Sequence, residues 1–210
     1  MLYIYDKIDL LEDEFLEDII PLLSETRLDK IKRLRSVQSK KVSAIAYLLL
    51  RIALLENHNI MEAVEFEYIG NGKPILRDYP QIHFNLSHSQ NTAACVIADS
   101  TVGVDVQKTK KVSDKVAKRV LTADEYAAFL SSCVPDEYFC EIWTIKESYL
   151  KKTGQGIAAE LRDIKAAGID NKAVTKGNGF FCCVCGSVAM SPQPLEIKYI
   201  GREDFGKLSN

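Results

Sequence analysis

The chain has 210 residues, of which 47% are hydrophobic and 27% charged, and its formal net charge is −2. This length and composition are typical of a globular protein with a core of its own, in one domain or two small ones. The near-zero charge argues against general nucleic-acid binding, and the N-terminus lacks the basic and apolar regions of a secretion signal. We therefore expect a cytoplasmic protein that binds neither nucleic acid nor membrane.

The first elements carry scaffold signals. Residues 2–5 predict a strand. Asp9 and Glu12 have the spacing of a capping box, which predicts a helix that begins there and ends near Pro21.

A strongly basic segment follows, and Ser24 is expected to cap it as a helix. Between positions 27 and 41 only one acid, Asp29, faces the basic residues Arg27, Lys30, Lys32, Arg33, Arg35, Lys40 and Lys41. A solvated helix surface is the ordinary explanation of such a run, but the imbalance in a slightly acidic chain favours an anionic partner. From Ser36 the pattern is apolar over most of the helix circumference, which predicts a core helix that contains Ser43.

The middle of the chain predicts strands at 64–68, 82–86, 93–98 and 102–106. A glycine-rich turn with Lys73 and Pro74 follows the first of these strands, and Ser87 and His88 follow the second. The Ser–His pair lacks a nucleophile elbow and an acid placed to orient it, so a serine hydrolase is not indicated.

Two acidic residues are candidates for a functional site. Asp105 lies in the apolar strand Val-Gly-Val-Asp-Val, where a carboxylate is costly unless it is paired or coordinated. Glu147 and Lys151 are one helical turn apart on a helix that Gly154 is expected to end. Taken alone, that pair would be a surface salt bridge, but with Asp105 it suggests a site that holds a metal ion.

Other signals favour structural roles. Thr122 and Glu125 form a capping box, which fully explains Glu125 as a helix-start residue. The six cysteines lack the spacing of a zinc site and are expected to be reduced and buried in the core. The last third of the chain predicts strands at 164–167, 180–185 and 195–200 and shows no catalytic motif.

Four motifs together resemble the 4′-phosphopantetheinyl transferase superfamily in its surfactin-type (Sfp-like) branch. They are Gly-Lys-Pro at 72–74, Phe-Asn-Leu-Ser-His-Ser at 84–89, Gly-Val-Asp-Val-Gln at 103–107, and Trp-x-x-Lys-Glu-Ser-x-x-Lys-x-x-Gly at 143–154. The resemblance covers residues 25 to 156. One position departs from the commoner pattern, because Gln107 stands where the family usually has glutamate.

The resemblance implies an α+β pseudo-dimer of two similar halves, here residues 1–100 and 101–210, with the active site in the cleft between them. It implies coenzyme A as substrate, Mg²⁺ or alternatively Mn²⁺ as cofactor, an apo acyl or peptidyl carrier protein as partner, and a monomer. The residues it assigns to coenzyme A are Arg27, Lys30, Ser43, Lys73, Pro74, Ser87, His88 and Lys151. Asp105, Glu147 and Gln107 would hold the metal, and Glu147, Lys151 and Glu125 would be catalytic.

The reaction so implied is that of a holo-[acyl-carrier-protein] synthase, in which the phosphopantetheine arm of coenzyme A moves to a carrier serine and 3′,5′-adenosine bisphosphate leaves. The general base stays open between Glu147, Glu125 and a metal-bound water. The alternatives are an inactive relative that binds carrier protein or coenzyme A, for which Gln107 is the argument, and a Mg²⁺-dependent phosphohydrolase.

Overall fold

The computed structural model describes residues 1–155, 160–186 and 195–209. The strands are β1 (Leu2–Tyr5), β2 (Phe66–Ile69), β3 (Lys73–Leu76), β4 (His83–Ser89), β5 (Thr92–Ala98), β6 (Val102–Lys108), β7 (Lys172–Gly177), β8 (Phe180–Gly186) and β9 (Ile197–Tyr199). The α-helices are α1 (Phe15–Asp18), α2 (Glu25–Lys32), α3 (Val37–His58), α4 (Asp114–Val120), α5 (Ala123–Ser131) and α6 (Pro135–Thr153). The 3-10 helices are η1 (Ile8–Leu10), η2 (Ile20–Leu22), η4 (Leu161–Asp163), η5 (Ala166–Gly168) and η6 (Arg202–Leu208).

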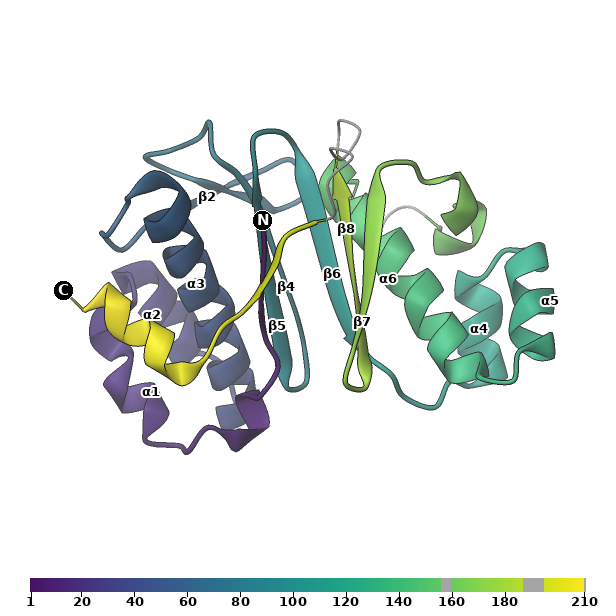
Figure 1. Cartoon of the computed structure of the whole chain (residues 1–210), viewed down its shortest axis with the longest axis horizontal. Coiled ribbons are helices and arrows are strands. Elements are labelled where there is room, and N and C mark those ends of the chain that lie inside the picture. The colour runs from purple at the N-terminus through teal and green to yellow at the C-terminus, as the bar shows by residue number, and fades with distance from the viewer. Residues whose placement is uncertain (156–159, 187–194, 210) are drawn as a thin grey trace.

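Two sheets lie in the middle of the molecule and helices cover their outer sides (Figure 1). The first sheet has the strand order β4-β5-β1-β9, and α3 packs on it with α1 and α2 beyond. The second has the order β6-β8-β7, and α6 packs on it with α4 and α5 on the far side. The mixed helix and sheet content confirms the expected α+β class, whereas the pseudo-dimer relation between the halves stays a prediction.

The two sheets share a core of alternating apolar residues. Because successive side chains of a strand point to opposite faces, one set from each strand faces the other sheet. This inter-sheet core contains Leu2, Ile4, Ala94, Val96, Val102, Val104, Val106, Phe180, Cys182 and Val184. A second, larger core lies between the first sheet and α3, whose residues are buried almost continuously from Lys41 to Leu54. This double burial explains why the central strands are apolar on both faces.

The seam between the two sheets is formed by side chains of β4. The Asn85 Oδ1 atom accepts a hydrogen bond of 2.9 Å from the backbone N–H of Val104. The hydroxyls of Ser87 and Ser89 accept bonds of 3.1 Å from the backbone N–H groups of Val106 and Lys108. Alternate residues of β4 thus bind alternate residues of β6, so the halves meet in a fixed register.

The end of the chain returns to the first half. Strand β9 pairs in parallel with β1, and the ring of Phe205 in η6 stacks on Tyr5 at 5.7 Å. Figure 1 shows this yellow segment crossing from the second sheet to the helices around α3. We keep the division between residues 100 and 101 as a proposal. It separates β1–β5 from β6–β8, but β9 and η6, which come later in the chain, pack with the first half.

Several helix signals are confirmed. The Ser24 and Ser36 hydroxyls accept bonds from the N–H groups of Arg27 and Ser39, so they cap α2 and α3. Thr122 and Glu125 form the expected capping box of α5. Gly154 ends α6 in the left-handed conformation, with φ of 69°.

Other expectations were wrong. Asp9 and Glu12 do not cap a helix; η1, α1 and η2 replace the single predicted helix, and Pro21 lies in the first turn of η2. No strand forms at 164–167, where one was predicted; η4 ends just before this stretch and η5 begins within it. Five cysteines are buried as expected, but Cys133 is exposed; none of the six forms a disulfide.

Within the described ranges, no helix has the length and apolar character needed to cross a membrane.

Candidate active site

The site begins with the close contact between α6 and β6. Gly103 lies directly under the helix, where an added Cβ atom would be 2.1 Å from the backbone oxygen of Ser148 and 2.4 Å from the backbone nitrogen of Lys152. Only glycine fits at that distance. Asp105, two residues further along β6, points to the same face of the sheet, so the close approach brings α6 alongside its carboxylate.

Asp105 is bound on one oxygen only. Its Oδ1 atom accepts hydrogen bonds from the Lys151 ammonium at 2.7 Å and the Ser87 hydroxyl at 2.9 Å. The Lys151 ammonium also lies 2.8 Å from the Ser87 hydroxyl. Oδ2 is buried and has no hydrogen-bond partner in the described part of the chain. A buried carboxylate oxygen without a partner is costly, and it fits a position that a cation would fill.

Glu147 lies close enough to Asp105 for the two charges to interact. Burial raises the pKa of Glu147, the charge of Asp105 raises it further, and Lys151 opposes the rise. A carboxylate whose ionised form is disfavoured by burial and by a neighbouring carboxylate favours a divalent cation beside it.

Gln107 lines the same cavity, of about 820 Å³, as Asp105 and Glu147. Its amide oxygen is a hard ligand of the kind that Mg²⁺ accepts, although it carries no charge. Among the described residues no cluster of three histidine, cysteine, aspartate or glutamate side chains could hold a metal. The donor set is thus two carboxylates and an amide, which suits an ion that keeps several water ligands.

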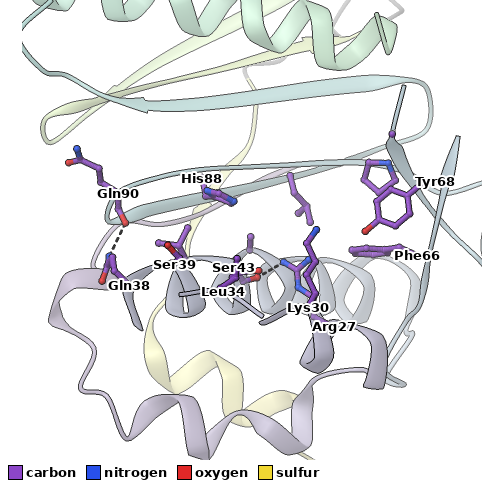
Figure 2. A pocket seen from close by; sticks show the side chains of 15 residues that line it. Arg27, Lys30, Leu34, Gln38, Ser39, Ser43, Phe66, Tyr68, His88 and Gln90 are labelled. Atoms are coloured by element: carbon purple, nitrogen blue, oxygen red, sulfur yellow. Dashed lines mark hydrogen bonds between the residues drawn. The ribbon is translucent and has the colours of Figure 1, made fainter. Parts of the chain in front are cut away.

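A second cavity, of about 510 Å³, lies between α2, α3 and β4 (Figure 2). Basic and polar residues line it on the helix side, including Arg27, Lys30 and Ser43, and His88 faces them from β4. The aromatic side chains of Phe66 and Tyr68 border it at one end (Figure 2). Cations beside flat aromatic surfaces can bind a ligand with a phosphate and a planar ring.

Arg27 is a buried part of this wall. Its guanidinium donates to the backbone oxygen of Ser43 and lies 5.5 Å from the centre of the Tyr47 ring. Its Nε atom is buried and has no partner among the described residues. Lys30 is exposed at the edge of the cavity. Arg27 therefore supplies a fixed positive charge, and Lys30 a movable one.

His88 and Ser87 point in opposite directions because they are neighbours in a strand. Ser87 turns to the seam and binds Asp105 and Lys151, whereas His88 reaches the basic cavity. The His88 ring is accessible to solvent at the cavity surface, yet surrounding protein atoms desolvate it and lower its pKa. The charges of Lys151, Arg27 and Lys30 lower this pKa further, so the ring is neutral at pH 7 in the free protein.

A third cavity, of about 320 Å³, joins the other two. It shares Gly72, Pro74 and Leu86 with the basic cavity. It shares Glu147 and Leu150 with the cavity of the two carboxylates. Together they form one groove that runs from the basic cavity past Lys151 to Asp105.

Glu125 is placed apart from this groove. Its Oε2 atom accepts bonds from the backbone N–H of Thr122 at 2.9 Å and the ammonium of Lys146 at 2.5 Å, and Oε1 accepts from the backbone N–H of Ala166 at 2.9 Å. Burial acts to raise the pKa of Glu125, but these bonds outweigh it and the pKa is lowered. Both oxygens thus have structural partners, which favours the capping role over the catalytic one.

Sequence reasoning missed several residues that line the groove. Arg119, Glu160 and Arg162 border the cavity of the two carboxylates. Phe66 and Tyr68 border the basic cavity, although the sequence indicated only that they belong to a strand. Lys146 is completely buried and donates to the carbonyls of Val120 and Leu161 as well as to Glu125. Ile142 and Leu150, four residues before and after it, share its helix face, and this apolar spacing was a signal that could have revealed the buried role.

Comparisons with known proteins agree with the motifs. A family model described as the 4′-phosphopantetheinyl transferase superfamily matches residues 101–190. The 4′-phosphopantetheinyl transferase psf-1 of Bacillus pumilus is 33% identical over 154 residues, which cover 72% of this chain and 66% of that protein. The transferase Sfp of Bacillus subtilis strain 168 is 28% identical over 154 residues, covering 72% of this chain and 69% of that protein.

HetI of Nostoc sp. PCC 7120, also named a 4′-phosphopantetheinyl transferase, is 42% identical over 114 residues, which cover 50% of this chain and 47% of that protein. The chain thus spans between about half and about two thirds of the length of these relatives.

Proposed function

The chain belongs to the 4′-phosphopantetheinyl transferase superfamily, and from this premise we propose that it transfers the 4′-phosphopantetheine group of coenzyme A to a serine of an acyl or peptidyl carrier protein. The observation that supports this most directly is the buried Asp105, with Glu147 and Lys151 beside it and one oxygen that has no hydrogen-bond partner among the described residues. These groups lie in the same groove as a basic cavity, as a substrate with a nucleotide at one end and a diphosphate in the middle requires.

The basic cavity would bind the nucleotide end of coenzyme A. Arg27, Lys30 and His88 face one another there and would attract the 3′-phosphate. Ser43 lines the same wall. Pro74 and the aromatic pair Phe66 and Tyr68 offer flat surfaces for the adenine.

Superfamily members use coenzyme A and generally depend on a metal ion, and the donor set fits Mg²⁺. Asp105 and Glu147 would hold it directly, with Gln107 as a weaker or water-mediated ligand; Mn²⁺ suits the same oxygens. When bound, such an ion offsets the negative charge of the diphosphate and polarises it for attack.

The residues of the chain position the reacting groups. Lys151 can leave Asp105 for the diphosphate and offset the charge that grows on the leaving phosphate. The serine oxygen of the carrier forms a bond to the phosphorus that bears the pantetheine arm, the bond from this phosphorus to the bridging oxygen breaks, and 3′,5′-adenosine bisphosphate leaves. Glu147 is the better placed carboxylate to accept the serine proton, because it lines the groove whereas both oxygens of Glu125 are held by hydrogen bonds elsewhere.

The remaining proposals concern context. We propose a monomer, because the two halves already supply both sides of the groove. The cytoplasm stays the expected location. The carrier protein would approach from the side of α4, where Val116, Lys118 and Arg119 border the cavity of the two carboxylates.

The purified protein tests this function directly. It is mixed with coenzyme A, Mg²⁺ and a panel of apo acyl and peptidyl carrier proteins, and each carrier is weighed by intact mass spectrometry. A carrier whose mass grows by one phosphopantetheine group supports the proposal, provided that a chelator abolishes the gain. Release of pantetheine phosphate without a carrier would instead show a hydrolase, and no mass gain on any carrier would contradict transfer.

A further inference from the structure

The turn between β2 and β3 reaches across the molecule to the end of α6. The side-chain amide of Asn71 donates to the backbone oxygens of Gly154 at 3.1 Å and of Gln155 at 3.2 Å. Gly72 adopts a φ of 90°, a conformation that favours glycine, and so allows the tight turn that presents Asn71. This contact joins segments that are more than 80 residues apart in the chain.

Lys73 makes a second contact with the same helix end. Its ammonium donates to the backbone oxygen of Lys152 at 2.9 Å and approaches that of Val102 at 3.5 Å. The carbonyl of Lys152 is among the last four of α6, which have no partner within the helix. A cation at this end also interacts favourably with the helix dipole. The ammonium of Lys73 is therefore bound to the helix end, although the sequence motif suggested a ligand of coenzyme A.

This clasp, formed by Asn71 and Lys73, connects two parts of the groove. Gly72 and Pro74 of the same turn line the basic cavity. Lys151 immediately precedes the clasped carbonyl of Lys152, and Glu147 is one helical turn earlier. The turn therefore sets the distance between the basic cavity and the catalytic end of α6.

We propose that Asn71 and Lys73 are positioning residues, which hold the last turn of α6 and with it Lys151 in line with a nucleotide bound in the basic cavity. The inference rests on the proposed function for its kinetic consequence, since a displacement of about 1 Å at a reacting group can cost up to ~10²-fold in rate. It does not depend on that function for its structural consequence. Without the clasp, the end of α6 opens more often to solvent.

The experiment compares Asn71→Ala, Lys73→Met and the double variant with the wild-type protein. Asn178→Ala, in the turn between β7 and β8, and Lys176→Met, in an exposed ion pair with Glu137, are the matched controls. Amide hydrogen exchange is followed at residues 150–155, and kcat and KM for coenzyme A are measured with one carrier protein.

In each variant of the clasp, the amides of residues 150–155 are expected to exchange faster. The value of kcat is expected to fall about 3- to 10-fold, the range that one net hydrogen bond implies. KM for coenzyme A should change less than about twofold. The controls leave both quantities unchanged. Unchanged exchange in Asn71→Ala and Lys73→Met would overturn the clasp. A second result would also overturn it: KM alone is raised in Lys73→Met, and Asn71→Ala matches the wild type. Lys73 would then be a phosphate ligand. If the wild-type protein transfers nothing, the proposed function fails, and the exchange data still decide the clasp.

Discussion

The ammonium of Lys151 lies 2.7 Å from Oδ1 of Asp105, although both groups are expected to turn toward other partners during the reaction. The same ammonium contacts Ser87, which belongs to the opposite half of the molecule. The free protein thus keeps the proposed catalytic cation on the carboxylate that would bind the metal. This arrangement implies that Lys151 and a divalent cation compete for the charge of Asp105.

Replacing Lys151 by methionine should increase the affinity for Mg²⁺ in the absence of coenzyme A. Removing one positive charge at a few Å from the metal position relieves ~1 kcal/mol of repulsion in a solvent-accessible site, or about 5-fold in affinity. Isothermal titration calorimetry checks this result. Lys152→Met is the control, because the Lys152 ammonium lies beside the Tyr149 ring and not beside Asp105. Unchanged or weaker binding by Lys151→Met would argue against the competition.

Replacing Glu147 by alanine should lower the rate of carrier labelling at least about 10²-fold, because a metal ligand and the proposed base are both lost. Glu141→Ala, on the same helix but outside the groove, is expected to keep its rate. Initial rates at saturating coenzyme A give the comparison, after circular dichroism has shown that both variants fold. Near-normal labelling by Glu147→Ala would refute the metal assignment.

Replacing Gln107 by glutamate should lower the Mg²⁺ concentration needed for half-maximal activity by at least about 3-fold, because a third negative charge joins the ligand set. A Mg²⁺ titration of labelling rate measures the effect. Gln81→Glu, on an exposed loop, adds the same charge away from the cavity and should leave the titration unchanged. Identical midpoints for wild type and Gln107→Glu would show that position 107 does not neighbour the metal.

Replacing Gly103 by alanine should destabilise the protein by about 1–3 kcal/mol, because the new methyl group meets the backbone of α6 and the helix must shift. The shift should also separate Glu147 from Asp105 and lower activity. Urea unfolding followed by circular dichroism measures the free energy of unfolding. The control is Gly168→Ala, since no atom of the described residues lies within 4 Å of a Cβ atom added there. Equal stability of the two variants would contradict the close packing.

The pKa of His88 predicts a pH effect on stability. The folded protein holds this pKa below the ordinary value of 6.5, by desolvation and by the charges of Lys151 and Arg27. Below pH 6.5 the unfolded chain therefore binds more protons at this position, so stability falls as the pH drops from 6.5 toward the folded pKa. His88→Gln should lose less stability than the wild type between pH 7 and 5, as measured by thermal unfolding, with His83→Gln as control. Parallel curves for wild type and His88→Gln would show that the ring titrates normally.

The sequence predicted the local features well where one residue type determines the structure. The caps at Ser24 and Ser36, the capping box at Thr122 and the helix end at Gly154 depend on neighbouring backbone groups only, and all are confirmed. Asp9 has the same pattern but fails, because the nearby chain is broken into short turns before Pro21.

Long-range partners could not be predicted in the same way. Strand alternation places Ser87 and His88 on opposite faces, but it does not show which face meets the second sheet and which meets the basic cavity. The contact of Lys73 could not be predicted either. Its motif suggests phosphate binding, but it does not show that the end of a helix lies within reach of the ammonium. From the sequence, Asp105, Glu147 and Lys151 could be assigned to one site only because the motifs that contain them have the spacing of the resembled family.

The seam of Asn85, Ser87 and Ser89 has a consequence for how this protein can change over generations. Main-chain hydrogen bonds of an ordinary sheet survive most amino-acid replacements, since every residue except proline carries both groups. Here the acceptors are side-chain oxygens, so these three hydrogen bonds between the halves depend on the amino acids at three positions. Single nucleotide changes at the codons for those positions can remove hydrogen bonds between the halves, while the shared apolar core still packs the two sheets together.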